Sequence, residues 1–248
     1  LAMLNQLSAH GVDVCWGIHV YAGLESGKIC VSAGPRMAGA AGVGIKVIGR
    51  GGHGSRPDMS VNPVFCAASI LTNTATAWVN QITAGRTVTL GVTSIQGGEA
   101  PNVIPDTADI LGSLRFFNDE EGEKAVRIFK NVAEHTAAMN NCQVQFDDRF
   151  CVLCAPVIND EYYSNLISAA LPEVLLENVT VSSCEPWYAS ESFSCYRRIC
   201  PSVLAHLGIN NPSYGSGAAH HNGFFDVDEG VLSTGVIATL KFVAMLQK

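Results

Sequence analysis

The sequence predicts a mixed α/β protein in which a β-α-β-β-α-β unit is inserted into a second, discontinuous domain. Apolar residues make up 48% of the 248-residue chain and charged residues only 15%, so the chain can bury a large core. Strand-like alternation and helix-like periodicity succeed one another in that order over residues 42–150. The flanks, residues 1–41 and 151–248, each lack a convincing core, so we expect them to form one domain together.

The inserted unit opens with a strand and a helix. Apolar residues alternate with small or polar ones over residues 43–47, which is typical of a half-buried strand. Apolar residues then recur every three to four positions over residues 61–82, which predicts a helix. Ser60 is the predicted N-cap, and Pro63 falls in the first turn, where its missing N–H costs little.

Three more strands and one more helix complete the unit. Alternation predicts the strands at residues 88–92, 110–116 and 144–146. A second apolar stripe over residues 125–139 predicts a helix, and Asn118 followed by Glu121 is a capping-box pattern before it. This order of elements is that of a ferredoxin-like sandwich, with both helices on one face of the sheet.

Composition restricts the partners and the compartment. Fifteen basic and 22 acidic residues give a net charge of −7, so we expect the protein to bind neither nucleic acid nor an anionic membrane. No apolar run reaches the roughly 18 residues that a membrane span needs. Nine irregularly spaced cysteines favour a reducing compartment, the cytoplasm. The chain opens at Leu1 within a predicted helix, and we expect a part upstream of it to be missing.

Two histidines are candidate metal ligands. His19 ends a strand-like segment next to a glycine-bearing loop, where it either ligates a metal or is a structural histidine. His221 lies in a glycine-bounded loop, and the nearby Asp226 is suited to hold its second N–H. The alternative for this loop is a polar cap of the final helix. The remaining histidines outside the glycine-rich loops are expected to fill surface or core positions: His10, His135 and His206.

Three residues of the inserted unit are candidate substrate contacts. His53 has glycine on both sides, and a histidine between strand and helix is a typical donor to a developing oxyanion. The alternative is an ordinary glycine-rich turn. Asn102 and Arg115 offer an amide and a guanidinium fork, which suit a carboxylate. Taken alone, Arg115 is more typical of a surface or interface, and we expect it on the strand face opposite Leu114 and Phe116.

Four stretches in this order resemble one known superfamily. They are WGIHV at 16–20, GGHGSRP at 51–57, NVIPD at 102–106 with GSLR at 112–115, and HNGFFD at 221–226. Together they resemble the dinuclear metallo-aminoacylases and exopeptidases, most closely the N-acyl-amino-acid amidohydrolases that include hippurate and auxin-conjugate hydrolases. A further stretch resembles the superfamily's Ser-Glu-Asp-Phe-Ser, with Ser192 in place of the aspartate.

The resemblance implies a metallopeptidase-like catalytic domain, made of 1–41 and 151–248, and a lid that also dimerises, residues 42–150. His19 and His221 would each ligate one of two divalent ions, Zn or Mn. His220 occupies the preceding, usually apolar, position and is the less favoured ligand.

The resemblance also assigns roles in the lid. His53 would reach into the active site of the partner in a homodimer and polarise the scissile carbonyl. Asn102 and Arg115 would hold the free carboxylate of the substrate, an N-acyl amino acid. The implied activity is metal-dependent hydrolysis of its amide bond.

The chain departs from the superfamily in one large respect. Three further metal ligands and the general base are expected upstream, on an Asp-bearing strand segment, a Cys-Gly-His-Asp stretch and a Glu-Glu pair, and none of these segments is present; Glu120-Glu121 belongs instead to the start of a predicted lid helix. We therefore expect this chain to be an incomplete, inactive fragment. The alternatives are a non-catalytic dimerisation or binding module derived from that family, or a structural protein that uses only the sheet edge of residues 42–150.

Overall fold

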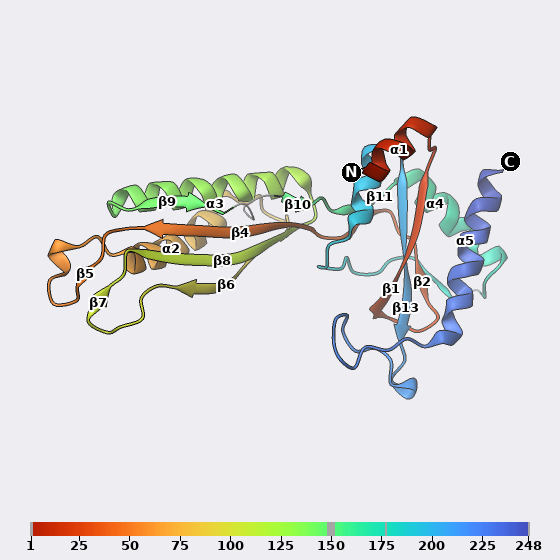
Figure 1. Cartoon of the computed structure of the whole chain (residues 1–248). Helices are drawn as coiled ribbons and strands as arrows, with labels where there is room; N and C mark the ends of the chain where they lie inside the picture. The colour runs from red at the N-terminus through yellow and green to blue at the C-terminus, as the bar shows by residue number, and fades with distance from the viewer. Residues whose placement is uncertain (1, 148–151, 177, 248) are drawn as a thin grey trace. The chain divides into compact units, whose positions relative to one another are not determined.

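The chain folds into two compact units (Figure 1). The computed structural model describes residues 2–147, 152–176 and 178–247. Unit 1 comprises residues 1–37, 157–187 and 192–248, and unit 2 comprises residues 38–156 and 188–191. The expected boundaries at 41/42 and 150/151 lie a few residues from the observed ones, and the assignment of 188–191 to unit 2 has no signal in the sequence.

Unit 2 contains an antiparallel sheet covered on one face by two helices, as Figure 1 shows. The strand order is β10-β4-β8-β6, with β9 also paired to β4. The strands are β4 (Gly39–Ile48), β6 (Val88–Gln96), β8 (Thr107–Phe116), β9 (Gln143–Phe146) and β10 (Val152–Cys154). The helices are α2 (Pro63–Gln81) and α3 (Asp119–Met139). The predicted β-α-β-β-α-β order is confirmed.

Helix α2 begins later than predicted. Its N-cap is Asn62, whose side chain accepts a hydrogen bond from the Val64 N–H at 2.9 Å. The prediction of Ser60 as the cap was wrong, because the Ser60 hydroxyl donates instead to the carbonyl of Pro57. Proline at the first helical position fixes where the helix starts, so the residue just before Pro63 becomes the cap.

Helix α3 has the predicted cap, with one change. The Asn118 side chain accepts from the Glu121 N–H at 3.0 Å. The Glu121 carboxylate accepts from the N–H and hydroxyl of Thr83, in the turn between α2 and β6. These hydrogen bonds, with Lys124 nearby, hold the pKa of Glu121 below its usual value. The carboxylate therefore ties the start of α3 to that turn.

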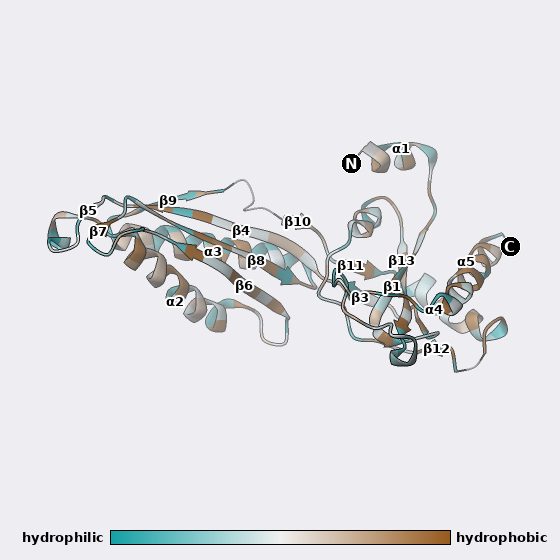
Figure 2. Cartoon of the chain, turned by 60° about the horizontal axis from the view of Figure 1, so that its bottom comes forward, coloured by the Kyte–Doolittle hydropathy of each residue, from teal (hydrophilic) through white to brown (hydrophobic). Residues whose placement is uncertain are grey.

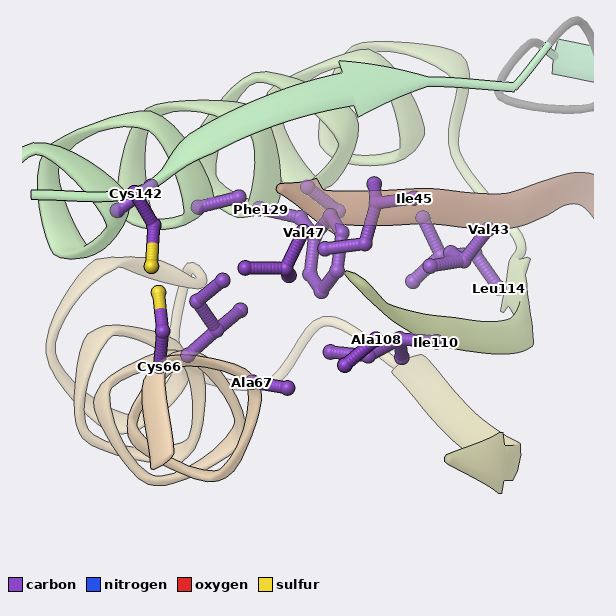
Figure 3. Packing of buried hydrophobic residues seen from close by; sticks show 14 of the residues in the cluster. Val43, Ile45, Val47, Cys66, Ala67, Ala108, Ile110, Leu114, Phe129 and Cys142 are labelled. Atoms are coloured by element: carbon purple, nitrogen blue, oxygen red, sulfur yellow. The ribbon is translucent and has the colours of Figure 1, made fainter. Parts of the chain in front are cut away.

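The core of unit 2 lies between the helices and the sheet (Figure 3). Phe129 of α3 is fully buried against alternate residues of β4 and β8, among them Val47 and Ile110. Cys66 and Cys142 point their sulfur atoms toward each other in Figure 3. Burial raises the pKa of the Cys66 thiol to about 12, so this pair behaves as small apolar side chains.

Unit 2 also contains a short ribbon. Strand β5 (Gly52–His53) pairs with β7 (Val103–Ile104), and a 3₁₀ turn, η1 (Pro57–Met59), follows β5. The ribbon continues from the end of the sheet at which β4 finishes and β8 starts (Figure 1).

Unit 1 is built on a sheet of order β1-β13-β2-β12, in which β1 and β13 are parallel. Its strands are β1 (Cys15–Glu25), β2 (Ile29–Cys30), β12 (Thr180–Val181) and β13 (Ser202–Asn210), with a separate pair of β3 (Gly34–Met37) and β11 (Val157–Asn159). Its helices are α1 (Ala2–His10), α4 (Glu161–Ala170) and α5 (Leu232–Leu246). Short 3₁₀ segments are η2 (Leu171–Glu173), η3 (Ser192–Arg198), η4 (Pro212–Tyr214) and η5 (Glu229–Val231).

One face of the unit 1 sheet is apolar. Ile29 and Ala205 pack with Ile167 of α4 and with Ala238 and Phe242 of α5. Figure 2 shows α5 as hydrophobic over most of its length. Helices α4 and α5 therefore cover this face, and the alternate residues of the strands point to the other one.

The stretch Glu229–Leu246 is long and apolar enough to cross a membrane, judged by length and composition alone. By this measure the prediction that no apolar run reaches this length is wrong, because the average hydropathy stays high although the stretch includes Glu229 and Lys241. Within unit 1 its residues Ala238 and Phe242 belong to the core beneath the sheet. Its apolar character is accounted for in part by this packing.

Candidate functional site

Polar side chains form a row across the second face of the unit 1 sheet. His19 of β1 is the register partner of His206 of β13, which is in turn the partner of Cys30 of β2. Residues paired across neighbouring strands share a face, so the three side chains lie on one side. A sheet face that carries imidazoles and a thiol, opposite an apolar face, is the candidate site of unit 1.

The indole ring of Trp187 packs against this row of side chains. The Trp187 ring lies edge-on to His19, with centroids 5.1 Å apart, and packs on His220 at 4.3 Å. It also contacts the Tyr21 ring at 5.2 Å. The centroids of His19 and His220 are 5.6 Å apart, so the structure brings a residue of the glycine-bounded loop to the strand histidine.

The hydrogen bond of His19 defines its neutral form. Its Nδ1 lies 2.7 Å from the Val20 carbonyl oxygen, which can only accept, so Nδ1 carries the proton. Nε2 is then the nitrogen with the lone pair. Histidines that bind metals in proteins almost always donate their other N–H to a carbonyl or carboxylate, so this geometry suits the predicted ligand role of His19.

His220 uses its ring differently. Its Nε2 accepts from the Ala22 N–H at 3.3 Å, so the lone pair of that nitrogen already faces a donor. Burial, together with the nearby imidazoles of His19 and His221, lowers the pKa of His220. The ring therefore joins the aromatic cluster around Trp187 as a neutral group.

His221 is exposed and lies next to this cluster in the chain. Its φ of 62° is in the left-handed region, which is uncommon for a residue other than glycine. Such backbone strain is often found at functional sites. The assignment of His221 as the second metal ligand stays a prediction.

Sequence reasoning treated His206 as a filler, and it lies fully buried at the centre of the row. Its Nδ1 is 3.6 Å from the Cys184 sulfur, and its ring packs on Tyr21 at 4.9 Å. Burial, and then the positive charge of Arg36, lower the pKa of His206 to about 3, so it is neutral at physiological pH. A lone histidine within the apolar strand β13 is the only signal that the sequence offered.

Two thiols and a guanidinium lie beside His206. The Arg36 Nη1 donates to the Cys184 carbonyl at 2.9 Å and lies 3.6 Å from its sulfur. A hydrogen bond from the Cys184 thiol and the charge of Arg36 lower the pKa of Cys30 to about 5. The proximity of Cys30 and burial raise the pKa of Cys184.

The donor set of unit 1 does not complete a metal centre. The resemblance implies two divalent ions, yet the described residues contain no group of three or more His, Cys, Asp or Glu side chains placed to hold one. A catalytic zinc site normally takes three protein ligands and a water. His19 has the right hydrogen bonding for a ligand, but the described side chains around it do not fit the whole group.

In unit 2 the structure brings His53 and Asn102 together. His53 pairs with Val103 across the β5–β7 ribbon, and the Gly54 N–H donates to the Asn102 carbonyl at 2.8 Å. A Cβ at Gly51 would lie only 2.8 Å from the Ile104 carbonyl, so the close approach of the two segments requires glycine there. The ribbon thus places both predicted substrate contacts on one loop pair.

Arg115 lies on the face of β8 that the helices leave uncovered. Its strand neighbours Leu114 and Phe116 are buried in the core, and Arg115 itself is half-buried, as the predicted alternation requires. Its Nη1 donates to the Leu114 carbonyl at 2.9 Å. The predicted face is confirmed, and the predicted role is not tested by this geometry.

The structure does not bring Arg115 to the other two residues. The β5–β7 ribbon adjoins Thr107, where β8 starts, and Arg115 lies near the end of the same strand. Eight residues of extended strand span roughly 27 Å. Asn102 and Arg115 of one chain therefore cannot hold the same carboxylate.

Comparison with known proteins agrees with this architecture. Residues 37–140 match a family described as the peptidase dimerisation domain of the M20 group, which covers most of unit 2. The chain is 29% identical over 233 residues to thermostable carboxypeptidase 2 of Saccharolobus solfataricus, covering 92% of this chain and 57% of that protein. It is 29% identical over 224 residues to N-acetylcysteine deacetylase of Bacillus subtilis, covering 90% and 56%.

A solved structure extends the similarity to the fold of both units. The YXEP protein of Bacillus subtilis, described as a dinuclear metal binding peptidase from the M20 family, superposes with a TM-score of 0.78 at 25% sequence identity. The match covers 98% of this chain and 60% of that one, so the chain spans little more than half the length of the proteins that it resembles. Unit 2 therefore matches the peptidase dimerisation domain of the M20 group, and along nearly its whole length the chain is similar to a structure described as a dinuclear metal binding peptidase of the M20 family.

Proposed function

We propose that the protein hydrolyses the amide bond of N-acyl amino acids in a metal-dependent reaction. The names of the relatives support this substrate class: a carboxypeptidase and an N-acetylcysteine deacetylase both act on an amide next to a free carboxylate. The observation that carries the proposal is the polar set of unit 2, in which the ribbon presents His53 with Asn102 and β8 presents Arg115 on its uncovered face.

Each of these residues has a proposed role. His53 donates a hydrogen bond to the oxyanion that forms from the scissile carbonyl, and loss of such a donor costs roughly 10²–10³ in rate. Asn102 and Arg115 bind the substrate carboxylate and so orient the amide. Since one chain keeps Arg115 roughly 27 Å from the ribbon, we propose that the set is assembled from two copies.

A homodimer through unit 2 is part of this proposal. Strand β6 lies at the edge of the sheet, and its nine residues, VTLGVTSIQ, carry no charge and no proline. Val92 and Ile95 of this strand are exposed, as is Phe65 of α2. Soluble proteins normally protect such an edge with charge or proline, so an unprotected edge is a surface for pairing with another strand.

The proposed activity needs metal ligands beyond His19 and His221. Zinc and manganese both accept imidazole and carboxylate ligands, so either ion suits the reaction. We propose that the chain alone is inactive, because its described residues do not complete the site. The irregular spacing of its nine cysteines supports a cytoplasmic location.

Hydrolysis of N-acetyl and N-benzoyl amino acids, compared with their carboxamides, tests the function. The assay uses two proteins, each with Zn²⁺ or Mn²⁺. One is the chain alone. The other, the joined protein, is the chain fused to the part of N-acetylcysteine deacetylase that has no counterpart in the chain. We expect no turnover by the chain alone and turnover of the acids by the joined protein. A folded joined protein that turns over no N-acyl amino acid would overturn the proposal, and turnover by the chain alone would overturn its inactivity.

The Arg115→Ala variant of the joined protein tests the carboxylate site. We expect its activity on the acids to fall roughly 10- to 100-fold, because a charged hydrogen-bond partner is lost, and its activity on the carboxamides to be spared. Arg86→Ala, an exposed arginine in the turn after α2, is the matched control. Equal losses on acids and carboxamides would count against the role of Arg115.

A non-catalytic dimerisation or binding module is the second candidate. It is favoured by the incomplete donor set of unit 1. It predicts a homodimer whose melting temperature does not change with Zn²⁺ or Mn²⁺, whereas a bound metal would raise it.

A further inference from the structure

Ser55 makes two contacts with the ring of His53. Its backbone N–H lies 3.1 Å from the His53 Nδ1, and its hydroxyl oxygen lies 2.8 Å from the same atom. Both groups come from one residue, two positions after the histidine. The Nδ1 atom is therefore engaged from within its own turn.

The backbone holds this arrangement in place. The Arg56 N–H donates to the His53 carbonyl at 2.9 Å, which closes a β-turn with Ser55 at its third position. Gly54 lies between His53 and Ser55 in the chain, and its N–H donates to the Asn102 carbonyl at 2.8 Å. The direction of the Ser55 N–H is thus fixed by the turn and by the ribbon.

The chemistry of these contacts defines the protonation of the ring. A backbone N–H can only donate, so the Nδ1 of His53 must accept. A neutral imidazole has one acceptor and one N–H, so its proton lies on Nε2. The Ser55 hydroxyl, 2.8 Å from Nδ1, can donate to the same lone pair in a bifurcated hydrogen bond, which strengthens the same choice.

Two other histidines of the chain show the opposite arrangement. The Nδ1 of His135 lies 2.7 Å from the Asn131 carbonyl oxygen, and the Nδ1 of His19 lies 2.7 Å from that of Val20. A carbonyl oxygen only accepts, so both rings carry the proton on Nδ1. The chain therefore contains two internal references for the Nδ1–H tautomer.

We propose that Ser55 is a positioning residue that holds His53 as the Nε2–H tautomer, so that Nε2–H is the group offered to an acceptor. The identity of that acceptor, the substrate oxyanion, rests on the proposed function. The tautomer itself rests only on the geometry of the turn. Ser55 contacts no reacting atom and acts through His53.

The ring nitrogens of His53 report the tautomer directly. Long-range ¹⁵N–¹H correlation spectra of the uniformly ¹⁵N-labelled chain, recorded near pH 8 where imidazoles are neutral, separate protonated from unprotonated nitrogens. The His53→Asn spectrum assigns the signals. We expect an unprotonated Nδ1 for His53 and, in the same spectrum, a protonated Nδ1 for His135. A protonated Nδ1 for His53 would overturn the proposal.

Three variants distinguish the effect of the Ser55 hydroxyl on the His53 tautomer from the effect of the backbone turn. In Ser55→Ala the hydroxyl is lost, and we expect the ratio of Nδ1–H to Nε2–H to rise roughly three- to tenfold, the effect of one neutral hydrogen bond. Ser55→Thr keeps the hydroxyl and should restore the wild-type spectrum. Ser60→Ala removes a hydroxyl that donates to Pro57 in the same loop and should leave His53 unchanged. An unchanged ratio in Ser55→Ala would overturn the role of the side chain.

Activity distinguishes this proposal from the proposed function. In the joined protein described above, Ser55→Ala should lower kcat in proportion to the Nε2–H population lost in the spectrum, a smaller factor than the change in the tautomer ratio, and leave KM within about twofold. The expected tautomer without any turnover would leave the role of Ser55 standing and count against amide hydrolysis. Turnover with His53 in the Nδ1–H tautomer would support amide hydrolysis and count against the role of Ser55.

Discussion

Unit 2 and unit 1 fill their interiors in different ways. In unit 2, both helices and one sheet face enclose an almost wholly apolar core around Phe129 and Ile110. In unit 1, only one face of the sheet is apolar, and the other buries His206 and Arg36 beside two thiols. The comparison shows that the interior of unit 2 is packed mainly with apolar side chains, whereas unit 1 uses part of its buried volume for polar and titratable groups.

The buried polar groups of unit 1 are also incompletely paired. Within the described part of the chain, the Nε of Arg36 and the Nε2 of His206 are buried and have no hydrogen-bond partner. Buried polar atoms are nearly always paired in folded proteins, because an unpaired one costs about 1–3 kcal/mol. We therefore expect unit 1 to be the less stable of the two, and three substitutions test this contrast.

The largest expected effect is on the core of unit 2. Phe129→Ala removes a fully buried ring from α3 and should lower the free energy of unfolding by about 3–5 kcal/mol. Urea unfolding combined with hydrogen exchange resolved to peptides of each unit measures the loss and shows where it acts. Val79→Ala on α2, where the side chain is 86% exposed, is the control and should change the value by less than about 0.5 kcal/mol. Similar losses in both variants would contradict the described core.

Acid should act on unit 1. His206 is neutral in the folded protein, and its pKa of about 3 lies below that of the unfolded chain. As the pH falls below the usual histidine value, the unfolded state binds a proton that the folded state does not. The stability contribution of His206 is therefore present at neutral pH and is lost on acidification, by roughly 3 kcal/mol between about pH 7 and pH 4.

Replacing the histidine tests this pH dependence. His206→Gln should flatten the fall in stability of unit 1 over that range, measured as urea midpoints at each pH. His135→Gln, on the exposed side of α3, should leave the slope as it is. An unaltered slope in His206→Gln would show that another group causes the acid sensitivity.

The smallest expected effect concerns the start of α2. Asn62→Ala removes the observed N-cap and should destabilise unit 2 by about 1 kcal/mol. Ser60→Ala removes the cap that the sequence predicted and should cost less, because that hydroxyl bonds to Pro57 instead. Thermal unfolding of the two variants side by side decides between the two caps, and a larger loss in Ser60→Ala would favour the sequence-based prediction.

The contrast between the units also explains what the sequence could predict. The elements of unit 2 follow from local alternation and periodicity, since each apolar stripe marks the face that packs in the core. The cap of α2 was placed wrongly because Ser60 has a suitable side chain, whereas Pro63 is the first residue of the helix and makes Asn62 the residue that meets the helix N–H groups.

The site of unit 1 depends on contacts that no local pattern reveals. The pairing of β1 with β13 joins residues far apart in the chain, and it alone places His206 beside His19. Trp187 and the Cys30–Cys184 pair arrive from other segments in the same way. In unit 2, the side-chain chemistry and the family resemblance suggested that Asn102 and Arg115 act together, and only the length of β8 shows that they lie apart within one chain.

The two-rung ladder between β5 and β7 has a consequence for protein engineering. It couples a loop before α2 to a loop after β6, so a change in the backbone of one displaces the other. Mutant libraries that vary only one of the two loops would mostly break the β5–β7 pairing and so displace the side chains of both His53 and Asn102. Altered selectivity is more readily obtained by varying the loops jointly while the glycines that let them meet are kept.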